Sequence, residues 1–476
     1  MALGTFLMHV WPLKFREVKD GGLIITDDAG GFFRSSEAFL TRYISGKLTA
    51  NDQKFLLRNG HAFLHERDIN FIGFAARWSR RINRVKELDF VILIPTLRCD
   101  LACSYCQVSR ANVNANGFDW SEEQLEAVLL WLGENAGPKL KVEFQGGECL
   151  LRIDLLERVR DYCRDRFEEV QFVVCTNLQN LSAEAWHFLS ATDTVLSTSF
   201  DGTMIQHQRQ RTKTPEATHR FEMNLLRAAT ELGPEKISAL PTFDPVDLPE
   251  PADVIRSFVA LGLRSIFLRR VNYQGFARKR YDFATTPNAW IDYYRQFVRA
   301  VVSHNAIVAE PVEEFYIAHL IRRIVQGGQH GHVNLRNPNW IAQDYIVIDF
   351  DGALYPSDEA RMMTRVGQID LSIGHVRTGF DENKIATLQT QVSNFDDPDC
   401  QHCAFQAYCG LDIIDDLSRY GRIDLPRPTT DHCQVHQGLF ELAFELIYSA
   451  DAATQHTVRS WLGVASLPAD TTPRHS

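Results

Sequence analysis

The chain has 476 residues, more than one compact core usually holds, so we expect about two to four domains. Hydrophobic residues make up 45% of the chain and charged residues 23%, and no window approaches the roughly 18 uninterrupted apolar residues of a membrane span. These values argue against membrane insertion. The net charge of -10 argues against nucleic acid as a partner, and the first residues do not show the pattern of a secretory signal. We therefore expect a cytoplasmic protein.

The first domain, residues 1–85, is predicted to be a small α+β module. It begins with a hairpin whose strand covers 23–26 and whose turn covers 27–30, since acidic residues and glycine follow an apolar run. A helix is expected next, with Ser35 or Ser36 as its capping residue. The pattern places one sheet and at least one helix in this module.

A second helix of the module is predicted over residues 48–60. Thr49 and Asp52 have the spacing of a capping box, in which each side chain binds the backbone N–H of the other residue. Gly60 can end the helix, because glycine adopts the left-handed conformation that often follows a last turn.

Residues 86–310 alternate between predicted strands and helices, the pattern of a parallel sheet with right-handed crossovers. The predicted fold class is α/β, with a sheet that is either open or curved into a partial (β/α)6 barrel of TIM type, the small N-terminal module before it and a loop-rich domain after it. The catalytic edge of such a sheet lies at the carboxyl ends of its strands. The strands are expected at 89–95, 139–145, 170–176, 194–200, 236–243 and 264–270, with helices at 121–134 and 152–167 among the intervening segments.

The alternation ends near residue 310, and residues 311–440 are expected to form a separate loop-rich domain. It should contain a helix over 312–326, a hairpin over 345–358 and a cysteine-rich region. Residues 441–476 complete a helical segment predicted over 438–462 and add a polar tail that we expect to fray.

Three of the ten cysteines, Cys99, Cys103 and Cys106, directly follow the first predicted strand of the sheet. A cubane cluster held by three thiolates leaves one iron open, so that a substrate or cosubstrate can bind it. Two other interpretations stay open on the spacing alone. The cysteines could hold zinc together with a distant His or Asp, or they could be unrelated core residues.

A second group of four cysteines can close a metal site completely, which suits a structural or electron-transferring role. Zinc is an alternative to an iron-sulfur cluster here, and nearby histidines allow other ligand sets. The cysteines are Cys400, Cys403, Cys409 and Cys433, and the histidines are His402, His432 and His436. The remaining cysteines, Cys149, Cys163 and Cys175, are expected to be small core residues.

The first cysteine motif, with two later motifs, resembles the radical S-adenosylmethionine (radical SAM) superfamily. Two glycines allow close backbone approach, and a carboxylate suits the amino group of the methionine moiety. The residues that carry the resemblance are Tyr105 before the last cysteine, Gly146, Gly147 and Glu148 after the second strand, and Ser199, Asp201, Gly202, His207 and Arg211 after the fourth.

This resemblance implies a 4Fe-4S cluster on Cys99, Cys103 and Cys106 that binds S-adenosyl-L-methionine. Reductive cleavage of the cosubstrate would give a 5'-deoxyadenosyl radical, which removes hydrogen from an unreactive position. Tyr105 and the glycine-glycine-glutamate turn would help to bind the cosubstrate. Ser199 and Arg211 would contact its polar groups.

The second cysteine group resembles the SPASM domain of peptide-modifying radical SAM enzymes, which normally carries seven cysteines for two auxiliary clusters. This sequence departs from that pattern, because Ile413 and Ser357 occupy two of the cysteine positions. The resemblance therefore implies that one auxiliary 4Fe-4S cluster remains. By this resemblance, Asp358 matches an aspartate that is thought to take a proton from the substrate in sulfatase-maturing relatives. The alternative interpretation is that Asp358 is an exposed carboxylate of a turn.

The layout of the whole chain looks like that of the His-Xaa-Ser system radical SAM maturases. This implies a ribosomally made precursor peptide with His-Xaa-Ser repeats as substrate, a second maturase of the same system as partner, and an electron donor such as flavodoxin or ferredoxin. The N-terminal module would bind a leader peptide by strand addition or would dock on the barrel as a cap. A sulfatase-type maturase that oxidises Cys or Ser, and a non-catalytic metal-stabilised peptide-binding protein, are the alternatives.

Overall fold

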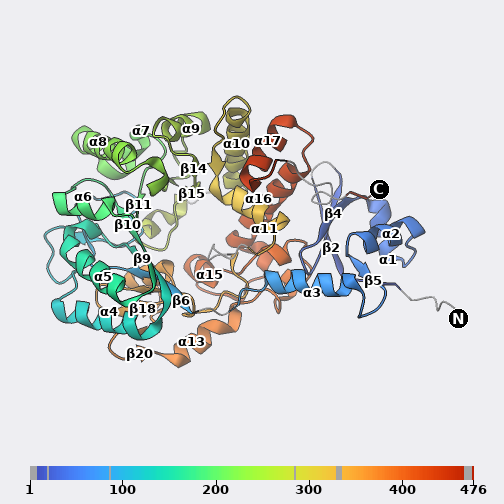
Figure 1. Cartoon of the computed structure of the whole chain (residues 1–476), viewed down its shortest axis with the longest axis horizontal. Coiled ribbons are helices and arrows are strands. Elements are labelled where there is room, and N and C mark those ends of the chain that lie inside the picture. The colour runs from blue at the N-terminus through green and yellow to red at the C-terminus, as the bar shows by residue number, and fades with distance from the viewer. Residues whose placement is uncertain are drawn as a thin grey trace.

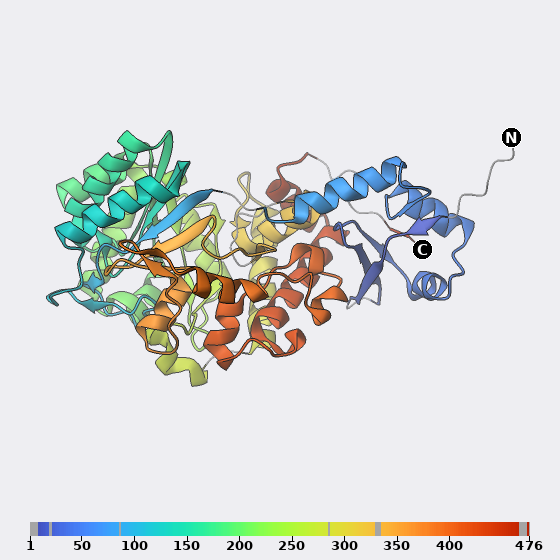
Figure 2. The same cartoon turned by 90° about the horizontal axis from the view of Figure 1, so that it is seen from below.

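A computed structural model describes residues 8–18, 21–84, 87–283, 286–328, 335–465 and 474–475. The molecule is elongated, with the N-terminal module at one end and the large sheet with its helices at the other (Figures 1 and 2). Helices from the last third of the chain lie between these two ends. None of the helices in these described segments is long and apolar enough to cross a membrane.

The N-terminal module contains the predicted hairpin and adds a third strand to it. Strands β2, β3 and β4 form an antiparallel sheet in that order, and a separate short pair joins β1 to β5. Three helices follow the sheet, of which the third was not predicted. The bounds are β1 His9–Val10, β2 Leu13–Glu17, β3 Leu23–Asp27, β4 Phe32–Ser35, α1 Glu37–Ile44, α2 Ala50–Arg58, β5 Ala62–Phe63 and α3 Ile69–Arg81.

Local signals explain where the helices of the module begin. Ser36, rather than Ser35, occupies the N-cap position of α1, and its side chain makes no capping hydrogen bond. The predicted capping box of α2 is present: the Thr49 side chain accepts from the backbone N–H of Asp52, and the Asp52 carboxylate accepts from the backbone N–H of Thr49. Gly60 has a φ of +73° directly after the end of the helix, as expected for a stop signal.

The central sheet has nine strands in the order β12-β11-β10-β9-β6-β17-β18-β19-β20. The pairs from β12 to β17 are parallel, and the pairs from β17 to β20 are antiparallel. The predicted strands therefore pair as expected over the first five units. The bounds are β6 Leu88–Leu93, β9 Ala136–Phe144, β10 Glu169–Thr176, β11 Thr194–Thr198, β12 Ile237–Ala239, β17 Tyr345–Ile348, β18 Ala353–Tyr355, β19 Gly374–His375 and β20 Gly379–Phe380.

The fifth and sixth predicted strands are each broken into two short pieces. Pro241 separates β12 from β13 (Thr242–Phe243), since proline has no N–H to donate to a ladder. The sixth segment splits into β14 (Ser265–Ile266) and β15 (Arg269–Arg270). β13 then pairs with β15, and β14 pairs with β16 (Glu313–Glu314), both in parallel. In the described residues no pairing returns from these strands to β17, which agrees with the predicted partial barrel.

The predicted hairpin at 345–358 is present as β17 and β18, but β17 also pairs in parallel with β6. The carboxyl-terminal region thus completes the sheet of the preceding domain. Periodicity predicts a hairpin but does not show which sheet edge it will join.

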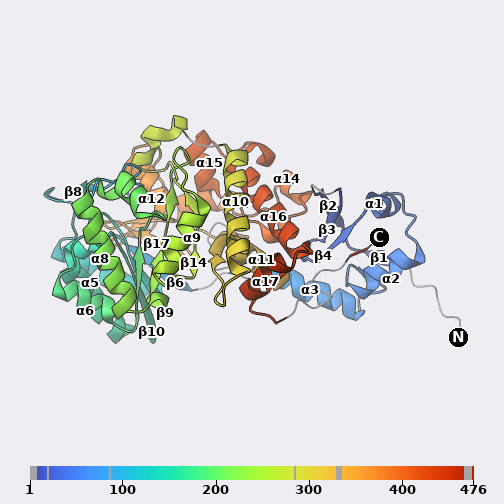
Figure 3. The same ribbon diagram turned by 90° about the horizontal axis from the view of Figure 1, so that it is seen from above.

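Helices surround the sheet and fill the space between its open edge and the N-terminal module (Figure 3). The predicted segment at 438–462 forms two helices, because the Asp451 side chain accepts from the backbone N–H of Thr454 and begins a new helix. The bounds are α4 Glu122–Asn135, α5 Ile153–Arg166, α6 Ala183–Ser190, α7 Met204–His207, α8 Pro215–Glu231, α9 Pro251–Ala260, α10 Pro287–Asn305, α11 Phe315–Val325, α12 Asp358–Arg365, α13 Glu382–Leu388, α14 Pro398–Gln401, α15 Ile413–Tyr420, α16 Asp431–Tyr448 and α17 Ala452–Leu462.

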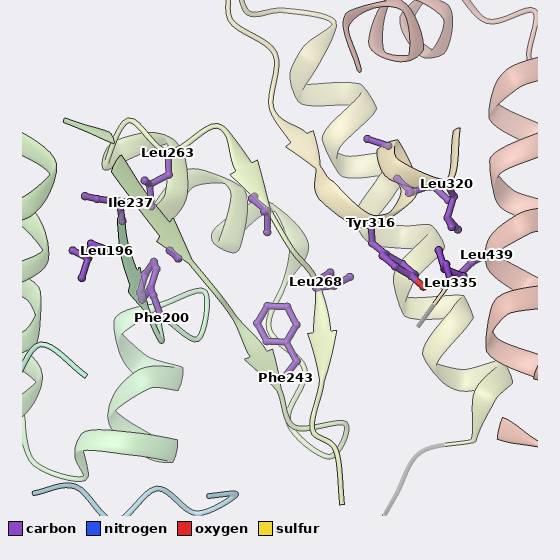
Figure 4. Packing of buried hydrophobic residues seen from close by; sticks show 14 of the residues in the cluster. Leu196, Phe200, Ile237, Phe243, Leu263, Leu268, Tyr316, Leu320, Leu335 and Leu439 are labelled. Atoms are coloured by element: carbon purple, nitrogen blue, oxygen red, sulfur yellow. The ribbon is translucent and has the colours of Figure 1, made fainter. Parts of the chain in front are cut away.

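One hydrophobic core runs from the sheet to the carboxyl-terminal helices. Side chains near β11 to β14, such as Leu196 and Ile237, belong to the same buried cluster as Tyr316 of α11 and Leu439 of α16 (Figure 4). A single continuous core fixes the position of the carboxyl-terminal region against the sheet.

Replacing Leu196 by alanine tests this core. Leu196 is fully buried in β11, so Leu196→Ala should lower the free energy of unfolding by about 2–5 kcal/mol. Leu130→Ala removes the same atoms from an exposed position of α4 and should change it by less than about 0.5 kcal/mol. Urea unfolding followed by circular dichroism measures both. Equal losses in the two variants would contradict the assignment of Leu196 to the core.

Candidate functional site

The loop that carries the first three cysteines leaves the sheet at the carboxyl end of β6. Its residues 98–99 form β7, which pairs in parallel with β8 (Ala111–Asn112). Cys99 and Cys106 are buried and Cys103 is half-buried, and all three are free thiols. Burial raises the pKa of the Cys99 and Cys103 thiols, so these residues hold thiolates readily only beside a compensating cation.

The two glycines at the end of β9 allow that turn to pack directly on the cysteine loop. A Cβ on Gly147 would lie 2.2 Å from the backbone oxygen of Arg98, and one on Gly146 would lie 2.2 Å from that of Thr96. The Gly147 N–H donates to the Thr96 oxygen at 3.0 Å, and the Glu148 N–H donates to the Arg98 oxygen at 2.8 Å. The glycines therefore position the loop that precedes Cys99.

Glu148 is buried and connects two loops of the site. Its carboxylate accepts from the backbone N–H groups of Leu150, at 3.2 Å, and Asn177, at 2.8 Å, and burial raises its pKa to about 7. The Asn177 side chain lies 3.8 Å from the Cys99 sulfur, and the Leu101 N–H donates to that sulfur at 3.4 Å. Glu148 thus holds in place a residue that contacts a cysteine.

Asp201 joins the cysteine loop to the segment after β11. This fully buried carboxylate accepts hydrogen bonds from the Tyr105 hydroxyl and from Arg211 Nε, the latter at 2.9 Å. The Arg211 guanidinium also lies 5.1 Å from the centre of the Tyr105 ring. Ser199 is half-buried just before Asp201, directly after β11. The structure therefore brings together Tyr105 and Arg211 through a carboxylate that the motif contained but the predicted site omitted.

The segment after β15 covers the same loop from another side. A Cβ on Gly275 would lie 1.8 Å from the backbone oxygen of Gln107, so only glycine fits there. Tyr105 packs in a small buried cluster with Val271, Tyr273 and Ala277. The close approach at Gly275 was not predicted, because one glycine in a loop has no distinctive local pattern.

A cavity of about 490 Å³ lies beside the loop and joins the sheet to the carboxyl-terminal region. Its walls include Gln107 of the cysteine loop, Arg269 and Arg270 of β15, Glu359 of α12 and Asp412 before α15. Burial raises the pKa of Glu359 to about 7 and that of Asp412 to about 6. The cavity therefore presents both cations and carboxylates near the predicted catalytic edge.

Asp358, the predicted base, is held by an arginine. Arg361 is fully buried, and its Nε donates to the Asp358 carboxylate at 2.8 Å. The cavity wall includes the next residue, Glu359, but not Asp358. The sequence pattern pointed to this turn and could not distinguish its two neighbouring carboxylates.

The second cysteine group lies at the starts of helices α14 and α16 and in the segment that follows α14. Cys400 is in the first turn of α14, where its N–H donates to Asp397, and Cys433 is in the first turn of α16, where its N–H donates to Thr430. Burial raises the pKa of the Cys409 thiol, and the nearby thiols of Cys433 and Cys403 raise it further. The fold thus gathers these thiols although one of them is distant in sequence.

The two positions where the SPASM pattern would require further cysteines have ordinary structural roles. The Ser357 hydroxyl accepts from the Ala360 N–H and caps α12. Ile413 is buried in an apolar cluster with Ala360, Met363 and Leu371. Both positions line a cavity of only about 40 Å³.

The donor sets fit iron-sulfur clusters in chemistry. Each group supplies thiols at least half-buried, and N–H groups donate to sulfur at Cys99 and at Cys403. In the described part of the chain, no three His, Cys, Asp or Glu side chains are arranged as the ligands of one metal ion. This does not count against a cluster, because each thiolate of an iron-sulfur cluster binds a different iron and the sulfurs therefore lie farther apart than the ligands of a single ion.

A comparison with protein families matches residues 93–257 to the model of the radical SAM superfamily. The matched segment begins in β6 and contains the cysteine loop, the glycine turn and the Asp201 segment. These residues form a radical SAM domain. The protein is therefore an enzyme whose cofactors are a 4Fe-4S cluster and S-adenosylmethionine.

Solved structures show that about three quarters of the chain has a known fold. The structure of native anSMEcpe with bound AdoMet is similar over 75% of this chain and 96% of that chain, with a TM-score of 0.57 and 17% identity. The same protein with AdoMet and the Cp18Cys peptide gives a TM-score of 0.58, at 17% identity, over 75% of this chain and 97% of that chain.

One curated relative also matches, an uncharacterized protein, MJ0907, of Methanocaldococcus jannaschii. It is 28% identical over 120 residues, which are 25% of this chain and 40% of that protein. The match therefore spans less than half of the relative.

Adding one methyl group at Gly147 tests the packing of the radical SAM loop. Gly147→Ala should displace residues 97–98 and lower the iron content of the domain severalfold, because Cys99 follows directly. Gly73→Ala is the control, since a Cβ there meets nothing closer than 3.8 Å. Iron analysis and the visible absorption of anaerobically purified protein measure the effect. Full iron content in Gly147→Ala would contradict this role.

Proposed function

We propose that this radical SAM enzyme is a peptide maturase that modifies a ribosomally made precursor with His-Xaa-Ser repeats. The observation that carries the proposal is the cavity of about 490 Å³, which opens between the cysteine loop and the carboxyl-terminal helices. Its mixed charges suit a peptide side chain. Its size is within the range of small-ligand sites.

In this proposal Cys99, Cys103 and Cys106 hold the first cluster. When bound, this cluster and S-adenosylmethionine supply radical abstraction of hydrogen from the substrate. The chain's own part is positioning: the glycine turn fixes the loop, and Asp201 orients Tyr105 and Arg211 toward each other. Ser199, at the carboxyl end of β11, is the proposed polar contact for the cosubstrate.

Cys400, Cys403, Cys409 and Cys433 are proposed to hold one auxiliary 4Fe-4S cluster. Four thiolates close such a cluster, so it would pass electrons rather than bind substrate. His432, beside Cys433, lines the same cavity as Glu359, so this group would lie near the proposed substrate site. A flavodoxin or ferredoxin would supply electrons, and a second maturase would act on the same precursor.

The N-terminal module is proposed to recognise the precursor, and the domain division at 85, 310 and 440 is part of this proposal. The module has a sheet, which a peptide strand can extend. The similar anSMEcpe structure was solved with a peptide, which supports a peptide substrate here. The cytoplasm is the proposed compartment, because clustered cysteines that hold iron need a reducing environment.

The experiment that tests the function is co-expression with a precursor that carries His-Xaa-Ser repeats, followed by mass spectrometry of that precursor. A mass change that requires the intact Cys99, Cys103 and Cys106 set is expected. An unchanged precursor would contradict the proposed substrate, whereas a modified cysteine or serine in a sulfatase sequence would favour the sulfatase-type alternative.

Metal analysis tests the two clusters separately. The parent should contain about eight iron and eight sulfide per chain, and Cys103→Ala and Cys400→Ala should each retain about four. Cys163→Ala is the matched control, because Cys163 is a buried core residue of α5, and it should retain about eight. Only Cys103→Ala should fail to form 5'-deoxyadenosine when reduced with S-adenosylmethionine. Zinc without sulfide would contradict the proposal and favour the metal-stabilised binding protein.

We infer that a carboxylate of the α12 turn accepts a proton from the substrate, and the cavity favours Glu359 over the predicted Asp358. A base must be ionised, and the pKa of Glu359 is about 7, so turnover should rise as pH increases through about 7 and then level off. Glu359→Gln should abolish this rise in turnover with pH, and Asp358→Asn should retain it. The pH profile of product formation distinguishes the two carboxylates. Loss of the pH dependence in Asp358→Asn and its retention in Glu359→Gln would identify Asp358 as the base.

A further inference from the structure

The free edge of β4 is covered by two residues from the far end of the sequence. Arg474 forms a parallel bridge with Arg34 of β4, and the His475 N–H donates to the Arg34 oxygen at 2.8 Å. The end of the chain lies beside the N-terminal module in the overall view (Figure 1). The expected fraying of the tail is therefore wrong for these two residues, which pair with the edge of the sheet through one isolated bridge.

The side chain of His475 enters a pocket that matches it chemically. Its ring lies 4.4 Å from the ring of Phe55 at an angle of 21°, and it meets Phe39 edge-on at 5.2 Å and 89°. Its Nε2 donates to the Asp52 carboxylate at 2.6 Å. A flat apolar surface and one acceptor thus receive the two parts of an imidazole.

The pocket is built by the module itself and holds its acceptor ready. Asp52 is 1% exposed, and Arg42 binds its carboxylate through two hydrogen bonds of 2.8 Å. These bonds hold the pKa of Asp52 well below its usual range, so the carboxylate is ionised and can only accept. A phenylalanine ring could stack on Phe55 but would make no hydrogen bond to Asp52, and a lysine could bind the carboxylate but would not stack. The pocket therefore selects histidine.

Arg474 anchors the segment outside the pocket. Its Nη2 donates to the backbone oxygen of Tyr448 at 2.8 Å, and its guanidinium lies 5.4 Å from the Tyr448 ring centre. The contact therefore joins the module to α16 as well as covering the sheet edge.

We propose that the β4 edge with the Asp52, Phe39 and Phe55 pocket is a binding site for a histidine carried on an extended peptide, and that Arg474–His475 occupy it as an internal competitor. This inference rests on the proposed function, since a precursor with His-Xaa-Ser repeats is the peptide that would displace the tail. Main-chain bonds to β4 supply the alignment, and the imidazole pocket supplies the selectivity. Because the tail is attached to the chain, its effective concentration is high, and it weakens the binding of any peptide from solution.

Fluorescence anisotropy with two labelled peptides tests this site. One peptide carries His-Xaa-Ser repeats, and the other has alanine in place of each histidine. His475→Ala should bind the histidine peptide about tenfold more tightly than the parent does, because a tail docked in about nine of ten molecules leaves the site open in one. The matched control His456→Ala changes an exposed histidine of α17 and should bind like the parent.

A synthetic peptide of residues 466–476 should displace the labelled histidine peptide from His475→Ala, and the same peptide with alanine at position 475 should not. Adding Asp52→Asn to His475→Ala should remove the gain in affinity, with circular dichroism to confirm that the module is folded. Equal affinities of parent and His475→Ala would overturn the proposal, as would equal tightening for both labelled peptides. Binding needs neither cluster nor cosubstrate, so failure here is distinguishable from an unmodified precursor in the co-expression experiment.

Discussion

The close packing of Gly146 and Gly147 on the backbone before Cys99 is the constraint on which the site depends. No side chain larger than hydrogen fits at either position, because the loop's carbonyl oxygens lie where a Cβ would be. The backbone hydrogen bonds made there satisfy groups that would otherwise be buried without partners. The end of β9 therefore fixes the position of the loop after β6, and with it the positions of the cysteines that this loop carries.

The buried carboxylate of Asp201 extends this order to the opposite side of the loop. It is the shared acceptor of Tyr105 and Arg211, so the cysteine loop and the segment after β11 meet at one carboxylate. An ionised carboxylate without these donors would be costly in such a position. The same interactions that stabilise the buried charge also fix the loop that carries the cluster.

The carboxyl-terminal region is part of the site as well as an addition to the domain. β17 pairs with β6, and the core continues without a break into α11 and α16. This arrangement brings Glu359 and His432 to the cavity that also contains Gln107 of the cysteine loop. A substrate in the cavity would contact both regions, so neither forms the site alone.

Features that depend on local chemistry and periodicity can be predicted from the amino-acid sequence alone. The alternating strands and helices of the sheet, the Thr49 capping box and the first cysteine group could be predicted, because each follows from residues near one another in the chain. Contacts between distant segments became visible only in the folded chain: the pairing of β17 with β6, the approach of Gly275 to Gln107, and the docking of His475 on the N-terminal module. Such contacts depend on which surfaces remain exposed after the local elements form, and local sequence patterns do not predict how those surfaces pack together.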